Sequence, residues 1–391
     1  MLLSQYFKKF FHSSQSSGII LIFCVIVSLL IANSAFGNAF QNILETAIGS
    51  ENLHLKYPVS VWINDGLMAV FFLLVGLEIK RELLEGELSS FKSASLPIIA
   101  AIGGMVVPAI IFAALNFNNE FSKGWAIPMA TDIAFSLAII SLLGKSVPAS
   151  LKIFLAALAI ADDLGAILVI AIFYTGEIHW NYLGYSALIV VLLIVLNFLK
   201  IKKIAFYLIP GFFLWFFMHH SGIHATIAGV LLAFTIPTNE SETEISPLEK
   251  LEQKLHLPVN FFIMPVFALA NTNILITSGI SAALSSTLGL GIIFGLFFGK
   301  VLGINLFSFL AVKLKISRLP EQSNWTQITG VGFLAGIGFT MSIFIAILSF
   351  KGIHTIQDEA KLAILAASVL SGITGFLLLK FSPKNKLENK S

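Results

Sequence analysis

Long apolar stretches separated by short polar segments make up nearly the whole chain. A helix needs about 20 apolar residues to cross a hydrocarbon core of about 30 Å. A sliding apolar window finds about twelve such stretches, so the pattern predicts an all-α polytopic membrane protein with about twelve transmembrane helices. The predicted spans cover residues 12–32, 59–80, 95–116, 124–143, 150–175, 182–199, 204–218, 223–237, 256–275, 288–311, 327–350 and 358–380.

The composition excludes a soluble enzyme. Hydrophobic residues make up 57% and charged residues 12% of the 391 residues, whereas soluble domains carry about 25% charge. A lone Cys24 rules out a disulfide framework or a cysteine-rich metal site. The first apolar stretch has no small-residue cleavage site, so we interpret it as a membrane helix and not as a signal peptide.

Lysine and arginine fall mostly on one side of the predicted membrane. If the N-terminus is cytoplasmic, nineteen of the 24 basic residues lie on the cytoplasmic side, four lie opposite, and Lys300 lies within a span. Cytoplasmic loops accumulate such residues. We therefore expect both termini to be cytoplasmic.

Two polar segments interrupt the apolar pattern. Residues 47–58 alternate polar and apolar positions around Gly49 and Ser50, which predicts a short external β-hairpin or, equally, an irregular loop. Residues 238–254 are rich in glutamate and are predicted to form a cytoplasmic linker that leads into an amphipathic helix.

Five ionisable residues lie well inside predicted spans. Such residues are costly to bury and indicate a functional site by default. The alternative is a buried ion pair that only fixes helix packing, but several aspartates against one lysine leave negative charge uncompensated. Asp65 lies nearer its helix end, where it could be a cap or an interfacial residue. The five residues are Asp65, Asp132, Asp162, Asp163 and Lys300.

The fifth span contains two adjacent aspartates in the segment IADDLGA. Successive helical residues point about 100° apart, so Asp162 and Asp163 do not share a face. One can meet a protein partner, such as Lys300, while the other faces a cavity. Carboxylate oxygens suit small hard cations, and burying two carboxylates together raises the affinity of at least one for protons. The pair can therefore hold either a proton or a cation.

Two spans carry helix-breaking residues at corresponding places. Pro128 precedes Thr131 and Asp132 in the fourth, and the eleventh contains several glycines, including Gly338, before Thr340. Ordinary kinks explain either span alone. Taken together they predict two discontinuous helices that cross at a binding site. The segments 95–175 and 288–380 correspond helix by helix and begin on opposite sides, which predicts inverted three-helix repeats.

Several segments resemble the signature sequences of the NhaA family of sodium/proton antiporters. The resemblance extends over nearly the whole chain. The segments that carry it are WAIPMATDIAF, LAALAIADDLGAI, SGIHATIAGV, FFGKVLG and GFLAGIGFTMSIF.

The resemblance implies a role for each matching residue. Asp163 corresponds to the main cation ligand, Asp162 to the carboxylate paired with Lys300, and Thr131 and Asp132 to residues at the helix crossing. It also implies a core that translocates ions, an interface region and a homodimer joined partly by the hairpin. The core would comprise residues 95–175 and 288–380, and the interface region residues 12–80 and 182–275.

A further acidic group resembles the family's cytoplasmic entrance, which is linked to pH sensing. The alternative is a solvated acidic vestibule that only attracts cations. The chain departs from the better-known pattern in having Glu249 and Gln253, so the pH set-point stays open. The entrance residues are Glu78, Glu82, Glu252 and His256.

The sequence therefore predicts a secondary active antiporter of the prokaryotic inner membrane. We expect it to extrude Na⁺ or Li⁺ for more than one H⁺, with no cofactor, no enzymatic activity and no nucleic-acid partner. The lipid bilayer and a second copy of the chain are the expected partners. The alternative is another secondary transporter of the same broad fold, such as a sodium-coupled organic-anion symporter. His219 and His220 are expected to be merely exposed at an external loop.

Overall fold

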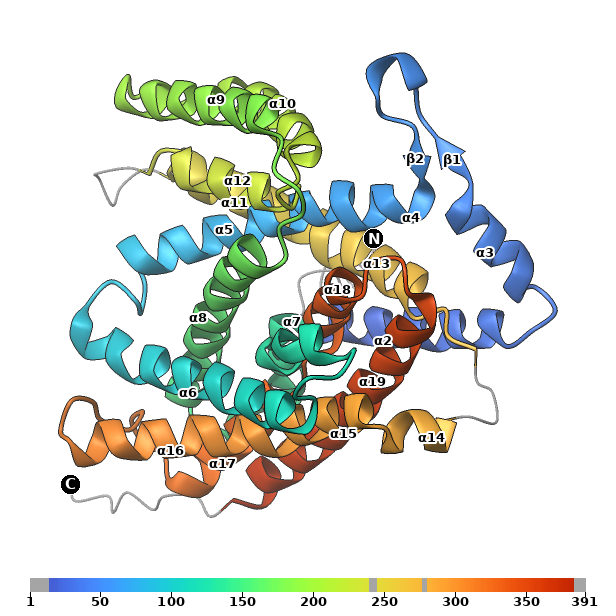
Figure 1. Ribbon diagram of the computed structural model, residues 1–391. Helices are drawn as coiled ribbons and strands as arrows, with labels where there is room; N and C mark the ends of the chain where they lie inside the picture. Colours follow the sequence, from blue (N-terminus) through green and yellow to red (C-terminus); the bar gives the residue numbers. More distant parts are fainter. Residues whose placement is uncertain (1–13, 239–244, 276–279, 383–391) are drawn as a thin grey trace, which may run out of the picture. The chain divides into compact units, whose positions relative to one another are not determined.

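The computed structural model describes residues 14–238, 245–275 and 280–382, and this part of the chain is mostly helical (Figure 1). Short 3₁₀ or π segments extend or join several of the helices. The helices are α2 (Ser14–Ala32), α3 (Gly37–Glu45), α4 (Val59–Val61), α5 (Met68–Leu84), α6 (Phe91–Leu115), α7 (Ile133–Leu142), α8 (Ala149–Phe173), α9 (Trp180–Phe198), α10 (Ala205–Ser221), α11 (Ile227–Thr235), α12 (Pro247–Pro258), α13 (Met264–Asn271), α14 (Ile280–Ser285), α15 (Thr287–Ile293), α16 (Lys300–Lys313), α17 (Trp325–Ala335), α18 (Phe339–Ser349) and α19 (His354–Phe381).

The helices confirm an all-α polytopic membrane protein. Among the described residues, seven helical segments are long and apolar enough to cross a membrane, and counting two bent pairs as spans brings the total to nine. The bent pairs are α2 with α3, at 109°, and α17 with α18, at 45°. The number twelve stays a prediction, as do the inverted repeats.

Three predicted spans differ in extent from the helices that the structure forms there. The span predicted at 204–218 corresponds to α10, which has 17 residues, and the one at 223–237 to α11, which has nine. A nine-residue helix is about 13 Å long at 1.5 Å per residue, too short to cross a bilayer alone. The residues of the span predicted at 256–275 are divided among the end of α12, a π segment (Val259–Ile263) and α13.

The chain divides into two compact units. The first contains residues 1–19, 85–166 and 274–391, and the second contains residues 20–84 and 167–273. Two of the four boundaries fall inside α2 and α8, so each of these helices contributes to both units.

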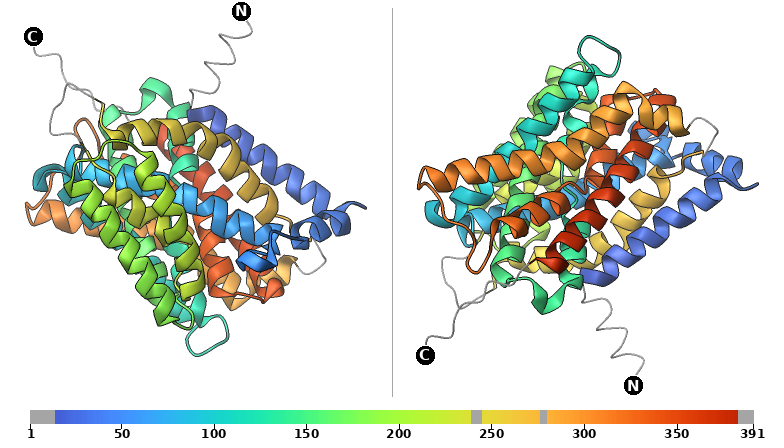
Figure 2. Two further views of the ribbon diagram at one scale, coloured as in Figure 1. Left: turned by 90° about the horizontal axis from the view of Figure 1, so that it is seen from above. Right: turned by 90° about the horizontal axis from the view of Figure 1, so that it is seen from below.

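In the first unit, α6 and α16 lie side by side because glycines remove side chains from their contact (Figure 1). A Cβ atom on Gly303 would lie 2.0 Å from the carbonyl oxygen of Gly103, a distance that only glycine permits. Small residues allow this close approach between membrane helices. On the same unit, α19 packs along α17 and α15 (Figure 2).

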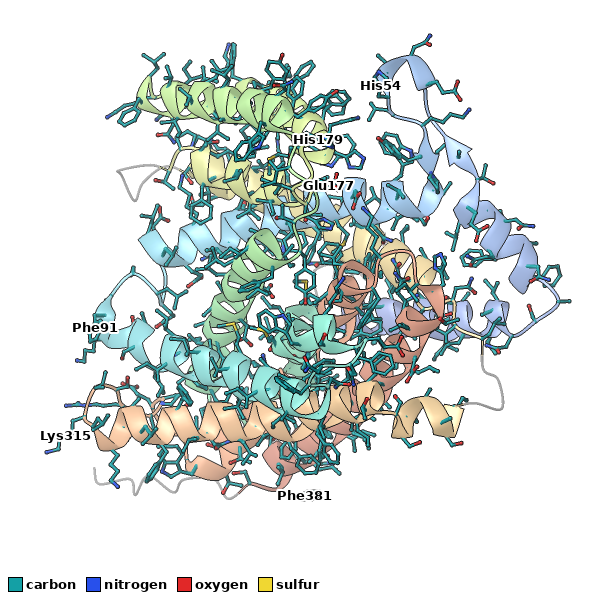
Figure 3. All side chains as sticks on the ribbon, in the orientation of Figure 1. His54, Phe91, Glu177, His179, Lys315 and Phe381 are labelled. Atoms are coloured by element: carbon teal, nitrogen blue, oxygen red, sulfur yellow. The ribbon has the colours of Figure 1, made fainter. Side chains whose placement is uncertain are left out.

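In the second unit, α9 and α10 pack against each other and also display large apolar side chains (Figure 3). Tyr207 and Leu214 of α10 are fully buried, whereas Leu188 and Phe198 of α9 are 67% and 82% exposed. An apolar surface of this kind is stable against lipid tails and unfavourable in water. The pattern fits helices that lie in a bilayer.

Regular secondary structure forms in both polar segments: a strand pair in the first and the start of a helix in the second. Strands β1 (Ala47–Ile48) and β2 (Tyr57–Pro58) pair antiparallel, with Ala47 opposite Pro58. Their placement outside the membrane stays a prediction. Within the predicted linker 238–254, Ser246 and Glu249 form a capping box that starts α12 at Pro247. Residues 239–244 of that linker, and both chain termini, lie outside the described residues.

Candidate functional site

The fourth and eleventh predicted spans are both interrupted, and the two interruptions contact each other. A 3₁₀ segment, Ser122–Met129, is separated from α7 by three extended residues. Likewise α17 is separated from α18 by residues 336–338. The backbone N–H of Asp132 donates to the carbonyl oxygen of Ile337 at 2.7 Å. This bond satisfies backbone groups that a broken helix leaves without intrahelical partners.

The Asp132 side chain joins the two interrupted spans. One carboxylate oxygen caps α7 by accepting from the backbone N–H of Phe135 at 3.0 Å. The other accepts from the backbone N–H of Thr340 at 3.1 Å and from the Thr340 hydroxyl. Asp132 is 1% exposed, so these donors replace water around the carboxylate. The helix start at α7 and that at α18 thus share one carboxylate.

Gly338 lies at the second interruption, where space is short. A Cβ atom at this position would lie 2.1 Å from the hydroxyl oxygen of Ser342 and 2.9 Å from Leu296. The carbonyl of Gly338 accepts from the N–H of Ser342 at 2.8 Å. The glycine therefore lets α18 begin close to its neighbours.

Asp162 and Lys300 form a fully buried ion pair. The Lys300 ammonium donates to Asp162 Oδ2 at 2.7 Å, and both side chains are 0% exposed. The same oxygen accepts from the Thr131 hydroxyl at 2.7 Å, and Lys300 also donates to the carbonyl of Met129. Met129 ends the 3₁₀ segment before the first interruption, and Thr131 lies within the interruption. Besides pairing with each other, Lys300 is thus held by a backbone carbonyl of the interrupted span and Asp162 by a hydroxyl from the same span.

The second carboxylate oxygen of Asp162 can still accept a hydrogen bond or bind a cation. Oδ1 is buried and accepts no hydrogen bond from the residues that the structure describes. A buried carboxylate oxygen without a donor is unfavourable unless a proton or a cation joins it. Together with the Thr131 hydroxyl oxygen it supplies the hard oxygen atoms that suit a small cation such as Na⁺.

Asp163 is buried beside this pair, at 1% exposure. It follows Asp162 on α8, so its side chain leaves the helix about 100° away from that of Asp162. The structure thus brings three buried aspartates and one buried lysine into the first unit: Asp132, Asp162, Asp163 and Lys300.

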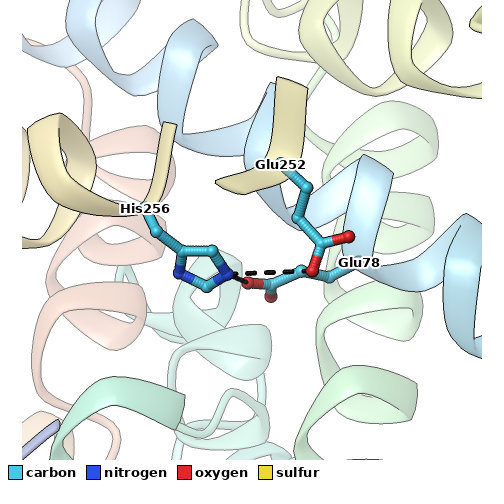
Figure 4. A group of neighbouring side chains, drawn as sticks. All are labelled: Glu78, Glu252 and His256. Carbon is cyan, nitrogen blue, oxygen red and sulfur yellow. Dashed lines mark ion pairs between the residues drawn. The ribbon is translucent and has the colours of Figure 1, made fainter. Parts of the chain in front are cut away.

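The predicted entrance residues come together in the second unit, on α5 and α12 (Figure 4). His256 Nε2 lies 3.5 Å from Glu78 Oε1 and 3.7 Å from Glu252 Oε1. Arg81 Nε lies 3.1 and 3.2 Å from the two oxygens of Glu252. Its Nη1 lies 3.0 Å from Glu82 Oε1. Three carboxylates therefore share one guanidinium and one imidazole.

His256 can change charge near neutral pH. It lies on α12, outside the helices that are long and apolar enough to span a membrane. The Glu252 carboxylate, and then that of Glu78, raise the pKa of His256 above its ordinary value, although partial burial and Arg81 oppose this. The protonated imidazole is consequently favoured at low pH, and its pairing is lost as pH rises through the raised pKa.

Asp65 has a partner that the sequence analysis missed. It lies in a π-helical segment, Trp62–Leu67, and its carboxylate is 3.4 Å from His219 Nδ1. His219 was expected to be exposed, but its side chain is only 13% exposed and stacks on Trp215. The i, i+4 spacing of Trp215 and His219 on α10 is the one sequence signal that could have suggested this.

Comparison with known proteins gives matches over nearly the full length. Residues 8–379 match the family described as Na⁺/H⁺ antiporter 1. The chain is 59% identical over 385 residues to the Na⁺/H⁺ antiporter NhaA 2 of Flavobacterium johnsoniae, covering 98% of this chain and 94% of that protein. It is 52% identical over 392 residues to the Na⁺/H⁺ antiporter NhaA of Flavobacterium psychrophilum, covering 100% of each. The NhaA antiporter of Dechloromonas aromatica is 51% identical over 385 residues, covering 98% of this chain and 97% of that protein.

Proposed function

The chain belongs to the NhaA family of Na⁺/H⁺ antiporters, and from that premise we propose that it exchanges Na⁺ or Li⁺ for protons across the prokaryotic plasma membrane. The observation that carries the proposal is the buried Asp162–Lys300 pair between interrupted helices, with Asp163 beside it. Intramembrane carboxylates at such interruptions are expected of ion carriers.

The proposed chemistry is competition for one carboxylate. Asp163 binds either a proton or Na⁺, and Asp162 Oδ1 and the Thr131 hydroxyl supply further oxygen atoms. Because one group cannot hold both ligands, binding of one releases the other. This is supported by the burial of Asp163 and by the unused oxygen of Asp162. Alternating access to the two sides then couples the two ion flows.

We propose that each cycle moves net charge. Na⁺ draws Asp162 toward itself and away from Lys300, which weakens the only ion pair recorded for this ammonium within the described residues. A buried lysine without its carboxylate loses its proton more readily. The second proton therefore comes from Asp162 or Lys300, and more than one H⁺ moves per Na⁺. Each charge moved couples to about 2.3 kcal/mol per 100 mV.

The remaining features of the proposal concern organisation and regulation. Residues 95–175 and 288–380 act as the ion-translocating core, and residues 12–80 and 182–275 as the region that forms a homodimer. Both termini face the cytoplasm. Exchange stops at acidic pH, chiefly because protons occupy Asp163, and the Glu78, Glu252 and His256 cluster adjusts the pH at which it begins.

Proton flux in proteoliposomes tests the function. Adding Na⁺ or Li⁺ outside vesicles whose interior is acidic should dissipate the pH gradient, whereas K⁺ should not. Flux that requires an added organic anion would favour the symporter, and no cation-dependent proton flux from correctly inserted protein would refute the proposal.

A further inference from the structure

A second group of side chains with the donor atoms of a cation site lies in the second unit. None of its members is proposed above as a direct ligand of the transported ion. Glu78 of α5 and Glu252 and His256 of α12 each present one donor atom, and all three atoms lie within 4.8 Å of one another (Figure 4). The donors come from two helices and combine two carboxylates with an imidazole nitrogen. This is a mixed donor set and not simply an acidic surface.

The spacing of these atoms matches zinc coordination. Zinc binds histidine nitrogen and carboxylate oxygen at about 2.0–2.2 Å, so neighbouring ligand atoms of a tetrahedron lie about 3.3–3.6 Å apart. His256 Nε2 lies 3.5 Å from Glu78 Oε1 and 3.7 Å from Glu252 Oε1. Small side-chain rotations are therefore enough to place all three atoms around one ion, with the fourth position left for water.

The surrounding charges also favour a divalent cation. Arg81 contacts Glu252 and Glu82, and His256 contacts Glu252 and Glu78. When the imidazole is neutral and both candidate carboxylate ligands, Glu78 and Glu252, are ionised, their two negative charges exceed the single positive charge of Arg81. The Glu252 side chain is only 9% exposed, so water screens this excess poorly. A divalent ion would compensate it.

The ligand that neutralises the cluster while bonding to its nitrogen is a transition-metal ion. Imidazole nitrogen suits Zn²⁺, Ni²⁺ and Cu²⁺, whereas Mg²⁺ and Ca²⁺ prefer oxygen ligands alone. We propose that Glu78, Glu252 and His256 form a Zn²⁺ site that ties α5 to α12. This site is separate from the Asp162 and Asp163 carboxylates, and the proposal does not depend on Na⁺/H⁺ exchange.

Metal binding to the purified, untagged full-length protein tests this site directly. At mildly alkaline pH, ZnCl₂ should raise the thermal unfolding temperature in a saturable way that a chelator reverses, because an ion that binds only the folded state stabilises it. MgCl₂ should have no such effect. Co²⁺ should give the visible absorption of a tetrahedral site, and Zn²⁺ should abolish that absorption.

Three variants locate the site. Loss of an outer-shell partner alone weakens zinc sites by about 10–100-fold, so loss of a ligand in His256→Ala should weaken Zn²⁺ binding by at least about 100-fold. Glu78→Gln keeps the Arg81–Glu252 contact, so it tests the site even if the other variant folds poorly. It should weaken Zn²⁺ binding by about 10-fold or more. His354→Ala, at the start of α19, is the matched control and should bind as the unmodified protein does.

Two results would overturn the proposal. One is the absence of a saturable temperature shift and of Co²⁺ absorption in the unmodified protein. The other is Zn²⁺ binding that persists at full strength in folded His256→Ala and Glu78→Gln. Neither result bears on proton flux, so failure of this site and failure of the exchange function are distinguishable.

Discussion

Two groups of charged side chains differ most in what surrounds them. Asp162 and Lys300 are 0% exposed and are held by each other, by Thr131 and by a backbone carbonyl. In the cluster of Glu78, Glu252 and His256, the histidine is 45% exposed and Arg81 is 34% exposed. Burial makes the first group depend on its partners, because an unpaired buried charge is costly. Partial exposure of His256 and Arg81 makes the second adjustable, because water or an ion can take the place of either side chain beside the more buried carboxylates.

The largest expected effect is at the buried group. Asp163→Asn should abolish Na⁺-driven proton flux in proteoliposomes, because an amide cannot exchange a proton for a cation. The protein should still fold, since asparagine keeps the shape of aspartate. Asp358→Asn is the matched control, because Asp358 is 40% exposed and pairs with Lys361 outside the site. Near-normal exchange by monodisperse Asp163→Asn protein would contradict the assignment.

The next effect is on stability. Lys300→Met should lower the free energy of unfolding by about 3–5 kcal/mol, because it leaves the Asp162 carboxylate buried without its cation. The double variant Asp162→Asn/Lys300→Met should recover much of that loss, since neither charge remains. Thermal unfolding in detergent measures both. Equal unfolding temperatures for the single variant and the unmodified protein would mean that the pair is not formed in the membrane protein.

Asp162→Asn alone should be milder for exchange than Asp163→Asn. The main cation ligand remains, but the pairing partner of Lys300 is lost, so the charge moved per Na⁺ should fall. Current on solid-supported membranes, divided by Na⁺ uptake, measures this ratio. If this ratio is the same as in the unmodified protein, the second proton does not come from the Asp162–Lys300 pair.

A smaller effect is expected where the interrupted helices meet. Thr340→Val removes the hydroxyl that donates to Asp132 but keeps the backbone N–H that donates to the same oxygen. Loss of one donor to a buried carboxylate costs about 1–3 kcal/mol, which should appear as a lower unfolding temperature. Thr329→Val is the control, because its hydroxyl contacts Asn305 and a carbonyl of its own helix. Equal decreases in unfolding temperature for both variants would show that the hydrogen bond to Asp132 stabilises the protein no more than the hydrogen bonds made by Thr329.

The smallest effect belongs to the partly exposed cluster. Glu252→Gln removes the carboxylate that contributes most to raising the pKa of His256. The imidazole should then lose its proton at lower pH, and activation of exchange should shift toward acid by about one pH unit or less. His256→Ala should likewise shift the profile, with little change in the maximal rate. If neither variant shifts the activity profile, the cluster only attracts cations.

Sequence patterns located the buried charges because such residues are rare in apolar spans. Pro128 and Gly338 likewise marked where the interruptions would occur. Other contacts could not be predicted, because they depend on how distant segments pack. The carbonyl of Met129 accepts from Lys300, and Asp65 meets His219 across a large separation in sequence. Hydropathy also gave no indication that α11 would have only nine residues, since an apolar window does not detect where a helix ends.

The most direct test of the central claim is the number of protons released when Na⁺ binds to the purified protein. Titration calorimetry in buffers of different ionisation enthalpy gives this number at constant pH. Competition at Asp163, with a second proton from Asp162 or Lys300, predicts release of more than one proton per bound Na⁺ and almost none in Asp163→Asn. Na⁺ binding without proton release in the unmodified protein would show that the cation and the proton do not share a carboxylate, and the account would be wrong.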